Sequence, residues 1–423
     1  MVLEYAPPER LQARTDNPRL HSEKQIARLM DSIRAFDFCA PVLVDADDVL
    51  IAGHGRLEAA RRLGLTRVPF VRLAHLRGPE ALALTLADNR LAELSTWDDA
   101  LLKQSFKSIA LDEGFDLTLT GFEAPEIDAH LFGNDFGAEA DEEPCPPLDG
   151  PAIARLGDLW TIGPHRLICA DALAPEAYAA LLDGALADQV LTDPPFNVAI
   201  EGNVSGKGKI KHRDFVMAAG EMSENEFIAF LTKMFENVRN HAKDGALVYA
   251  FMDGAHLYEL LSAARSAGLA QKAFCTWGKT NAGMGSLYRS QTEHVGVFRA
   301  GKAAHRNNVQ LGRFGRNRTT LWSYPGMNTF GANRQAALAA HSTVKPVGLL
   351  KDAILDASPR DGLVLDPFAG SGSTLLAAHR AQRRGAGIEL DPLYVDVALR
   401  RLSTILKIDP IRADGVPWSK LAG

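Results

Sequence analysis

An acidic, proline-containing turn near the middle of the chain carries side chains that could bind a planar substrate with an exocyclic amine. The apolar strand formers at 190–191 lead into it, and the two prolines at 194–195 then prevent both helix formation and strand pairing. Asp193 and Phe196 are therefore held at the carboxyl end of a strand, where open α/β sheets bind their ligands. A carboxylate, a carbonyl oxygen from the first proline and an aromatic ring together suit a planar substrate that carries an exocyclic amine.

The turn also has a plain structural interpretation, in which Asp193 only caps the next segment, because Asp and Pro are common in turns. A second motif far downstream favours the functional interpretation. There an apolar strand at 363–366 is followed by a glycine turn that opens a helix. Glu389 ends a further strand about 17 residues beyond Gly372, close to the ~20 residues expected before an acid that binds ribose hydroxyls. The spacing predicts a cofactor that contains a ribose.

Three motifs together resemble the β-class DNA amino-methyltransferases. They are Asp-Pro-Pro-Phe at 193–196, His-Ser-Thr-Val-Lys-Pro at 341–346 and Phe-Ala-Gly-Ser-Gly at 368–372. In this family the catalytic motif precedes the S-adenosylmethionine loop, a permuted order, and the motifs occur here in that order over roughly residues 156–406. The resemblance implies an α/β fold with a Rossmann-like, S-adenosylmethionine-dependent methyltransferase sheet.

The resemblance also assigns roles to individual residues. The catalytic residues would be Asp193, Pro194, Pro195 and Phe196. The cofactor-binding residues would be Asp171, Thr343, Lys345, Asp366, Phe368, Gly370, Gly372 and Glu389. Asp193 and the Pro194 carbonyl would each accept one amino hydrogen, and Phe196 would stack on a base flipped out of the duplex. For Asp171, a helix cap before Ala174 is an equal alternative to a contact with the cofactor adenine.

The first residue of the catalytic motif bears on which base is methylated. In the family, Asp at this position goes more often with adenine and Ser more often with cytosine. Because Asp193 stands here, we expect methylation of the adenine N6 amine, with cytosine N4 as the alternative. The motif usually ends in Tyr, and Phe196 keeps the ring but lacks the hydroxyl.

Two other classes of protein share parts of the pattern. A nicotinamide-dependent oxidoreductase would carry a third glycine at position 375, where this chain has Leu375. A non-enzymatic, nucleotide-switched DNA-binding protein would fit the first part of the chain but would leave the Asp-Pro-Pro-Phe turn unexplained.

The composition limits what surrounds these motifs. A chain of 423 residues exceeds one ordinary domain, and 46% hydrophobic residues is typical of a globular protein. A net charge of −6 means that any DNA-binding surface must be a local patch. The 4 cysteines have no metal-site spacing, so no metal is expected. Reduced cysteines and the lack of a signal peptide or membrane-length apolar run predict a cytoplasmic protein.

Residues 1–132 are expected to form a smaller α+β unit. A glycine turn at 53–55 opens a helix there, and it resembles the signature turn of ParB-like nuclease/sulfiredoxin-type domains, which binds phosphate groups or nucleotides. The matching positions are Gly53, Arg56, Ala59 and Ala60, and the departures are His54, Gly55 and Glu58. Gly53, Gly55 and Arg56 would bind phosphate at the helix N-terminus, and no cleavage of DNA is expected.

Segment 133–151 is acidic and proline-rich and has no basic residue, so it predicts a linker to a methyltransferase domain at 152–423. The sequence of that domain predicts alternating elements. Helices are expected at 224–238, 255–267 and 347–357, and strands at 159–162, 165–169, 246–251, 272–277 and 293–298.

Two basic segments of this domain are expected to contact double-stranded DNA. The first is a glycine-rich stretch with Lys207, Lys209, Lys211 and Arg213. The second is a long target-recognition insert at about 278–334 with Arg313, Arg316 and Arg318 among aromatic residues. Basic side chains neutralise phosphates, and aromatic and polar groups contact bases. The sequence leaves a homodimer open.

Overall fold

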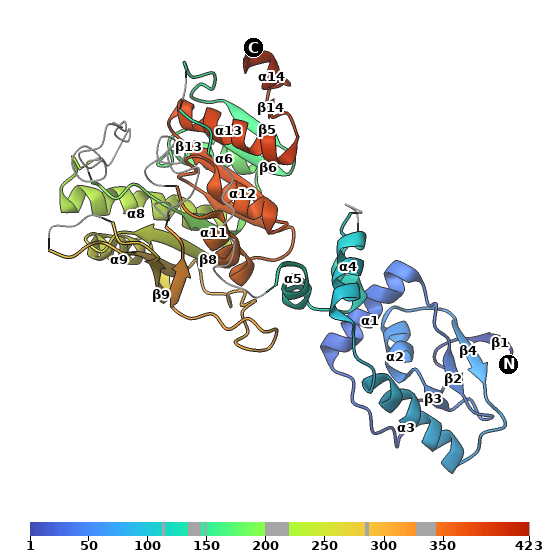
Figure 1. Ribbon diagram of the computed structural model, residues 1–423. Helices are drawn as coiled ribbons and strands as arrows, with labels where there is room; N and C mark the ends of the chain where they lie inside the picture. Colours follow the sequence, from blue (N-terminus) through green and yellow to red (C-terminus); the bar gives the residue numbers. More distant parts are fainter. Residues whose placement is uncertain are drawn as a thin grey trace. The chain divides into compact units, whose positions relative to one another are not determined.

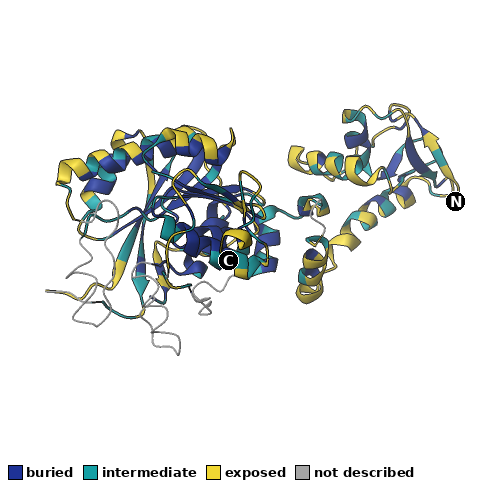
Figure 2. Cartoon of the chain, turned by 90° about the horizontal axis from the view of Figure 1, so that it is seen from above, coloured by how far each residue is buried: buried dark blue, intermediate teal, exposed yellow. Residues whose placement is uncertain are grey.

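The computed structural model divides into two compact units, Met1–Leu131 and Phe132–Gly423 (Figure 1). It describes residues 1–111, 115–133, 145–148, 150–198, 220–283, 287–326 and 344–422. Within these ranges, no helix is long and apolar enough to cross a membrane. Each unit has buried strands of its own, which Figure 2 shows in dark blue.

The first unit is built on a four-stranded sheet in the order β1-β4-β2-β3. Its strands are β1 Leu3–Ala6, β2 Val42–Val44, β3 Leu50–Ala52 and β4 Val68–Arg72. Its helices are α1 Glu23–Phe36, α2 His54–Arg62, α3 Pro79–Glu93, α4 Asp99–Ile109, η1 Leu117–Thr120 and α5 Ala124–Phe132, the last residue of which begins the second unit. Strands β2 and β4 are parallel, and Val42, Leu57 and Phe70 belong to one buried cluster that joins the sheet to α2. The expected α+β class is therefore observed for this unit.

The second unit is built on a ten-stranded sheet in the order β11-β9-β10-β8-β7-β12-β13-β6-β5-β14. Its strands are β5 Leu159–Ile162, β6 His165–Cys169, β7 Ala187–Thr192, β8 Ala242–Met252, β9 Ala270–Lys279, β10 Thr292–Arg299, β11 Leu321–Tyr324, β12 Leu363–Asp366, β13 Arg384–Glu389 and β14 Ile411–Arg412. Its helices are α6 Pro175–Leu182, α8 Glu224–His241, α9 Leu257–Ser266, α11 Val347–Ala357, α12 Ser373–Arg380, α13 Pro392–Leu406 and α14 Ser419–Ala422. The expected helices and strands of this domain are all present.

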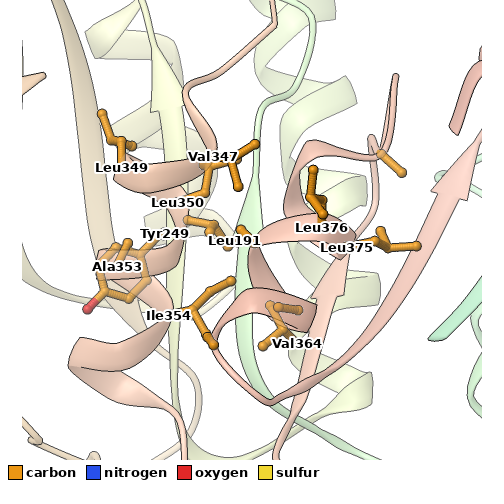
Figure 3. Close-up of a cluster of buried hydrophobic side chains, with 14 of the residues drawn as sticks. Leu191, Tyr249, Val347, Leu349, Leu350, Ala353, Ile354, Val364, Leu375 and Leu376 are labelled. Carbon is orange, nitrogen blue, oxygen red and sulfur yellow. The ribbon is translucent and has the colours of Figure 1, made fainter. Parts of the chain in front are cut away.

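Helices cover both faces of the central strands. Val190 and Leu191 are neighbours on β7 and belong to different buried clusters, because successive side chains of a strand point to opposite faces. One cluster joins the sheet to α11, α12 and α13, and the other joins it to α6, α8 and α9. Figure 3 shows the first, with Leu191 and Val364 of the strands against Ile354 and Leu376 of the helices. The apolar residues at 190–191 and 363–365 are buried on both faces of the sheet, which explains why these segments could be recognised from the sequence.

The central strands run parallel, and the chain adds strands on opposite sides of the β7–β12 pair. Strand β7 is followed in the sheet by β8 on one side, while β12 is followed by β13 and then β6 on the other. Strands β7 and β12 are themselves parallel neighbours, with Val190 opposite Leu365. The carboxyl ends of such a strand pair open into the crevice where doubly wound sheets bind ligands. The Asp-Pro-Pro-Phe turn and the downstream glycine turn both begin there.

The last part of the segment expected to be a linker packs against the second unit. Cys145 is 7% exposed and packs with Val344 and Val397 of the second unit, with Leu148 beside them. These apolar side chains find a partner surface far away in the sequence, which the local composition of the segment does not reveal. The compact second unit accordingly begins at Phe132.

Candidate active site

The turn that follows β7 is fixed by its own last residue. Asn197 adopts a left-handed backbone conformation with φ 55°, which asparagine tolerates better than most residues. Its side-chain oxygen accepts hydrogen bonds from the Gly220 and Met222 amides at 3.1 and 3.2 Å, and its side-chain nitrogen donates to the Met222 carbonyl at 2.7 Å. Pro194 is buried. The turn is therefore anchored to the segment that leads into α8, Glu224–His241.

Asp193 lies in this turn with one carboxylate oxygen engaged and the other unpaired. Its Oδ2 is 2.5 Å from the Lys345 ammonium, whereas its Oδ1 is buried and has no hydrogen-bond partner among the described residues. Burial raises the pKa of Asp193 to about 6, and the Lys345 charge opposes this rise. The group is thus an anionic acceptor at neutral pH, with one oxygen still able to accept a hydrogen bond.

Phe196 lies on the same turn, beside the Lys345 ammonium. The ammonium nitrogen is 5.3 Å from the centroid of the Phe196 ring and 5.3 Å from that of Phe251. Phe196 is only partly buried, although it packs against the apolar clusters on both faces of the sheet. A half-buried ring next to a carboxylate suits stacking on a planar substrate.

The glycine turn after β12 is shaped by a buried carboxylate and by backbone conformation. Asp366 is 3% exposed and accepts a hydrogen bond from the Phe368 amide at 3.0 Å, and burial raises its pKa to about 6. Gly370 and Gly372 have φ of 51° and 79°, a region that residues with a Cβ rarely adopt. A Cβ on Gly372 would lie 3.0 Å from that of Ala398, whereas none of the described atoms lies within 4 Å of a Cβ on Gly370. The close contact at Gly372 requires tight helix packing, and the open space at Gly370 leaves room for a ligand.

Glu389 ends β13 and faces the same turn. Its two carboxylate oxygens each accept one backbone hydrogen bond, from the Gly370 amide and the Asp391 amide, both at 2.8 Å. Each oxygen retains a further lone pair, so the pair fits two vicinal hydroxyls of a ribose. Burial raises the pKa of Glu389 to about 7. The residues of the turn therefore fit the predicted ribose-containing cofactor.

Asp171 follows β6 and is a third acid at this edge of the sheet, beside Asp366 and Glu389. The neighbouring Ala170 amide donates to the Glu389 carbonyl at 2.9 Å, which places Asp171 next to the end of β13. Its side chain accepts a hydrogen bond from the Leu173 amide at 2.8 Å, while the N-cap of α6 is Ala174. The alternative in which Asp171 caps α6 is therefore wrong, because the helix begins later than that alternative requires.

Comparison with known proteins identifies this arrangement. The profile of the DNA methylase family matches residues 187–400, just over half of the chain. The chain belongs to the DNA methylase family. The match begins at β7 and ends within α13, so it contains the Asp-Pro-Pro-Phe turn, the glycine turn and Glu389.

Individual relatives are DNA-modifying enzymes. The chain is 24% identical over 257 residues to Type II methyltransferase M.HpaI of Haemophilus parainfluenzae, which covers 57% of this chain and 74% of that protein. Among solved structures, the M1.HpyAVI–SAM complex is similar with 21% identity and a TM-score of 0.42, covering 56% of this chain and 98% of that one.

The first unit of this DNA methylase is ParB-like. The ParB N-terminal domain matches residues 2–90, and the ParB-methyltransferase HTH domain matches 100–156, across the segment expected to be a linker. The ParB-like nuclease domain-containing protein YnaK of Escherichia coli (strain K12) is 42% identical over 72 residues, which are 17% of this chain and 83% of that protein. The N-terminal resemblance predicted from Gly53 and Arg56 is thus confirmed.

The glycine turn of the ParB-like unit opens α2. Gly53 is the N-cap, with φ 97°, and a Cβ there would lie 2.7 Å from Val42 Cγ1. A Cβ on Gly55 would lie 3.0 Å from Leu29 Cδ1, so close packing requires glycine at both positions. Arg56 reaches the Pro41 carbonyl at 3.4 Å, and its Nε has no partner among the described residues. The turn therefore keeps an unsatisfied cationic donor beside a helix N-terminus.

Two arginines of the predicted DNA-binding insert are buried. Arg316 is 1% exposed and pairs with Asp356 of α11 at 2.7 Å, and Arg318 pairs with the other oxygen of Asp356 at 2.9 Å. Arg318 also donates to the Tyr324 hydroxyl at 2.8 Å. The prediction that these two arginines bind DNA is wrong, because their charges are used to hold the insert onto α11. Arg313 is exposed, so its assignment stays a prediction.

Several predicted residues lie outside the described part of the chain. They are Lys207, Lys209, Lys211 and Arg213 of the glycine-rich stretch and Thr343 of the middle motif. Lys345, from the same motif as Thr343, was expected to hold the cofactor, but its described partners are the carboxylates of Asp193 and Glu293.

Glu293 was not predicted as a site residue, nor was Lys279, although both lie beside the catalytic turn. Glu293 is 3.1 Å from the Lys345 ammonium, and Lys279 is 2.5 Å from Glu293. Glu293 belongs to β10 and Lys279 to β9, each at the end of its strand where the site lies and near buried apolar residues. A charged residue within such a strand was the signal available in the sequence, since buried charges are rare without a partner.

Proposed function

We propose that this DNA methylase is a site-specific methyltransferase that acts on the N6 amine of adenine in double-stranded DNA. The observation that carries the proposal is the buried Oδ1 of Asp193, which has no hydrogen-bond partner among the described residues and lies beside the half-buried ring of Phe196. A buried acceptor without a donor costs free energy unless a ligand satisfies it, and the exocyclic amine of a base supplies that donor. The Asp at the first position of the motif favours adenine over cytosine.

The cofactor of this family is S-adenosylmethionine, whose sulfonium supplies an electrophilic methyl group when it is bound. Glu389 would accept hydrogen bonds from the ribose hydroxyls, and the open space at Gly370 would admit the cofactor close to the backbone. Asp171 lies next to Glu389, in position to contact the adenine ring of the cofactor. Asp366 would contribute indirectly, because its carboxylate holds the Phe368 amide and hence the turn.

Asp193 would activate the target amine. An adenine amine is a poor nucleophile because its lone pair is delocalised into the ring. A hydrogen bond to Asp193 Oδ1, with a second to the Pro194 carbonyl, would draw the nitrogen toward a tetrahedral geometry. Transfer of the sulfonium methyl group to this nitrogen would release one amino proton, which Asp193 would accept. Orientation of the two reactants supplies much of the acceleration.

The ParB-like unit would add contacts to phosphate. The Gly53 turn places backbone N–H groups and the Arg56 guanidinium at the N-terminus of α2, an arrangement that attracts anions. Phosphates of DNA or of a nucleotide have the required chemistry. This unit would therefore affect how tightly DNA is held and not the methyl transfer itself.

Substitution of Asp193 tests the proposed chemistry. Asp193→Ala should retain S-adenosylmethionine binding and lose methyl transfer by on the order of 100-fold or more, because a positioned acid–base group contributes about 10²–10⁴-fold. Asp188→Asn is a matched control on the same strand, since Asp188 pairs with Lys243 at 2.7 Å at the other end of β7. Near-native transfer by Asp193→Ala would refute the mechanism.

The base assignment needs a separate measurement. Duplex DNA methylated by the whole chain should be hydrolysed to nucleosides, which are then separated and identified by mass. N6-methyladenine is the expected product. If N4-methylcytosine is found instead, the methyltransferase assignment stands and the adenine assignment fails.

A further inference from the structure

Four buried or half-buried charges form a continuous row that ends at the catalytic carboxylate. The row runs from Lys279 to Glu293 at 2.5 Å, from Glu293 to Lys345 at 3.1 Å and from Lys345 to Asp193 at 2.5 Å. The side chain of Lys345 is 7% exposed and that of Glu293 is 15% exposed. Positive and negative charges alternate, so each charge lies next to its opposite and the four together are neutral.

The row joins four separate elements at the carboxyl edge of the sheet. Lys279 ends β9, Glu293 lies near the start of β10, Lys345 precedes α11 and Asp193 follows β7. Strands β9 and β10 are antiparallel neighbours with Glu293 opposite Trp277, and the Lys279 ammonium lies 4.8 Å from the Trp277 ring. Glu293 and Lys279 are therefore held by the sheet itself, which makes them a rigid support for Lys345.

Glu293 determines how the Lys345 ammonium meets Asp193. An ammonium has three donors and no acceptor. Without Glu293, Asp193 would be its one remaining carboxylate partner among the described residues and could accept more than one of these donors. With Glu293 on its other side and the rings of Phe196 and Phe251 nearby, the ammonium contacts Oδ2 of Asp193. The Oδ1 atom has no hydrogen-bond partner among the described residues.

We propose that Glu293, supported by Lys279, is a positioning residue for methyl transfer: it holds Lys345 against Oδ2 of Asp193 and keeps Oδ1 available for the target amine. This inference rests on the proposed role of Asp193. It assigns Lys345 to the catalytic carboxylate and not to the cofactor, and it gives a function to two residues that lie outside the three motifs.

The acid limb of the pH–rate profile reports on this row. The charged groups that face Asp193 are Lys345, Glu293 and Lys279, with Asp366 at the end of neighbouring β12. The negative charge of Glu293 raises the pKa of Asp193, and the positive charge of Lys279 lowers it. Loss of Glu293 should therefore move the acid limb to lower pH, whereas loss of Lys279 should move it to higher pH.

The experiment uses the whole chain with the variants Glu293→Gln and Lys279→Met. Single-turnover methyl transfer is measured against pH on saturating duplex DNA, and S-adenosylmethionine binding is measured by calorimetry. For Glu293→Gln we expect roughly 10- to 100-fold slower transfer at the plateau, the range typical of groups that orient a reactive residue. Cofactor affinity should stay within about twofold. The two variants should shift the acid limb in opposite directions.

Glu259→Gln is the matched control. Glu259 is another buried carboxylate of the second unit, 8% exposed on α9. Within the described residues, no hydrogen bond or ion pair joins it to the row. A loss of general stability would affect both glutamate variants alike and would leave the acid limb in place, whereas a positioning role is specific to Glu293.

Two results would overturn the inference. The first is a Glu293→Gln enzyme with the plateau rate and the acid limb of the Glu259→Gln control. The second is loss of cofactor binding in Glu293→Gln, which would assign Lys345 to the cofactor instead. If Glu293→Gln does not fold, Lys279→Met decides, because an unshifted acid limb in that variant contradicts the row. Near-native transfer by Asp193→Ala would instead remove the proposed function itself, so the two failures are distinguishable.

Discussion

Each of the two units contains a glycine turn that opens a helix, and the two turns have similar backbone conformations but neighbours of opposite charge. In the ParB-like unit Gly53 is the N-cap of α2 with φ 97° and ψ 21°, and in the methylase unit Gly372 is the N-cap of α12 with φ 79° and ψ 20°. Both glycines follow a strand and open a helix without a side-chain cap. The backbone alone would thus offer a similar set of N–H donors to a ligand in each unit.

The side chains around the two turns set them apart. Buried carboxylates, Asp366 and Glu389, face the turn of the methylase unit, and their hydrogen bonds take up the Phe368 and Gly370 amides. In the ParB-like unit the neighbour is the guanidinium of Arg56. Carboxylates repel phosphate and accept hydroxyls, whereas a guanidinium attracts phosphate. A glycine turn therefore specifies close approach of a ligand, and the charges beside it specify which ligand.

The largest expected effect contrasts Glu389 with Arg56. Glu389→Ala should weaken S-adenosylmethionine binding by roughly 100-fold or more, since two hydrogen bonds to a charged group contribute about 1.5–3 kcal/mol each. Arg56→Ala should leave that affinity unchanged, because it belongs to the other turn. Calorimetric titration of both variants checks the contrast. Equal losses in the two variants would show that the turns do not act on separate ligands.

The short motifs were predictable because each lies within a few consecutive residues. The turn at Asp193 and the acid at Glu389 are readable from local patterns, since a strand end and a glycine turn fix their positions in any doubly wound sheet. The base specificity and the phosphate site stay predictions, because they depend on ligands as well as on the fold.

Contacts between distant segments were not predictable in the same way. Glu293 meets Lys345 only because β10 and α11 converge at one edge of the sheet. A run of arginines and aromatic residues has the same sequence pattern whether it faces DNA or a buried acid. Arg316 and Arg318 were misassigned for this reason, since their partner Asp356 lies 40 and 38 residues downstream.

A second effect distinguishes the two turns by pH. The pKa of Glu389 is raised to about 7 by burial, and only its ionised form can accept two hydroxyls. Cofactor affinity should therefore be full above pH 7 and should fall as the pH drops below this value, by up to about tenfold per unit.

The matched variant for this titration is Glu389→Gln, which cannot ionise. Its weaker binding of S-adenosylmethionine should be independent of pH between about 5.5 and 8, apart from the smaller contribution of Asp366. Wild-type affinity that stays constant over the same range would show that the buried carboxylate is ionised throughout. The Arg56 guanidinium contributes no such titration, because it stays protonated.

A smaller effect is expected at the ParB-like turn. Arg56→Ala should weaken DNA binding by about tenfold, as expected for one lost charge-assisted hydrogen bond, and should reduce the salt slope by about 0.9 per lost phosphate contact. Single-turnover transfer on saturating DNA should be kept. Binding isotherms over a range of salt concentrations provide the measurement. Arg62→Ala is a control on the same helix as Arg56, because Arg62 pairs with Glu58 of α2 and with Glu23 of α1. If both variants bind DNA with the affinity and salt slope of the wild type, the Gly53 turn only begins α2 and contacts no phosphate.

Removal of the whole ParB-like unit should have a very small effect on cofactor affinity, although it also removes the proposed phosphate contact of Arg56. A fragment Phe132–Gly423 corresponds to the compact second unit and contains both Asp366 and Glu389. It should bind S-adenosylmethionine within about twofold of the whole chain, because the proposed cofactor-binding residues all belong to the second unit. Calorimetry on the fragment and on the whole chain provides the comparison.

The starting residue of that fragment is itself informative. A shorter fragment that begins at Gly150 removes Cys145 and Leu148, which pack with Val344 and Val397, and also Phe132, which packs against the core of the second unit. Burial of one apolar side chain stabilises a fold by about 1.5–3 kcal/mol, so the shorter fragment should unfold at lower temperature while its cofactor affinity at 25 °C stays the same. If the longer fragment cannot bind S-adenosylmethionine, the methylase turn depends on the ParB-like unit and the two glycine turns are not independent sites.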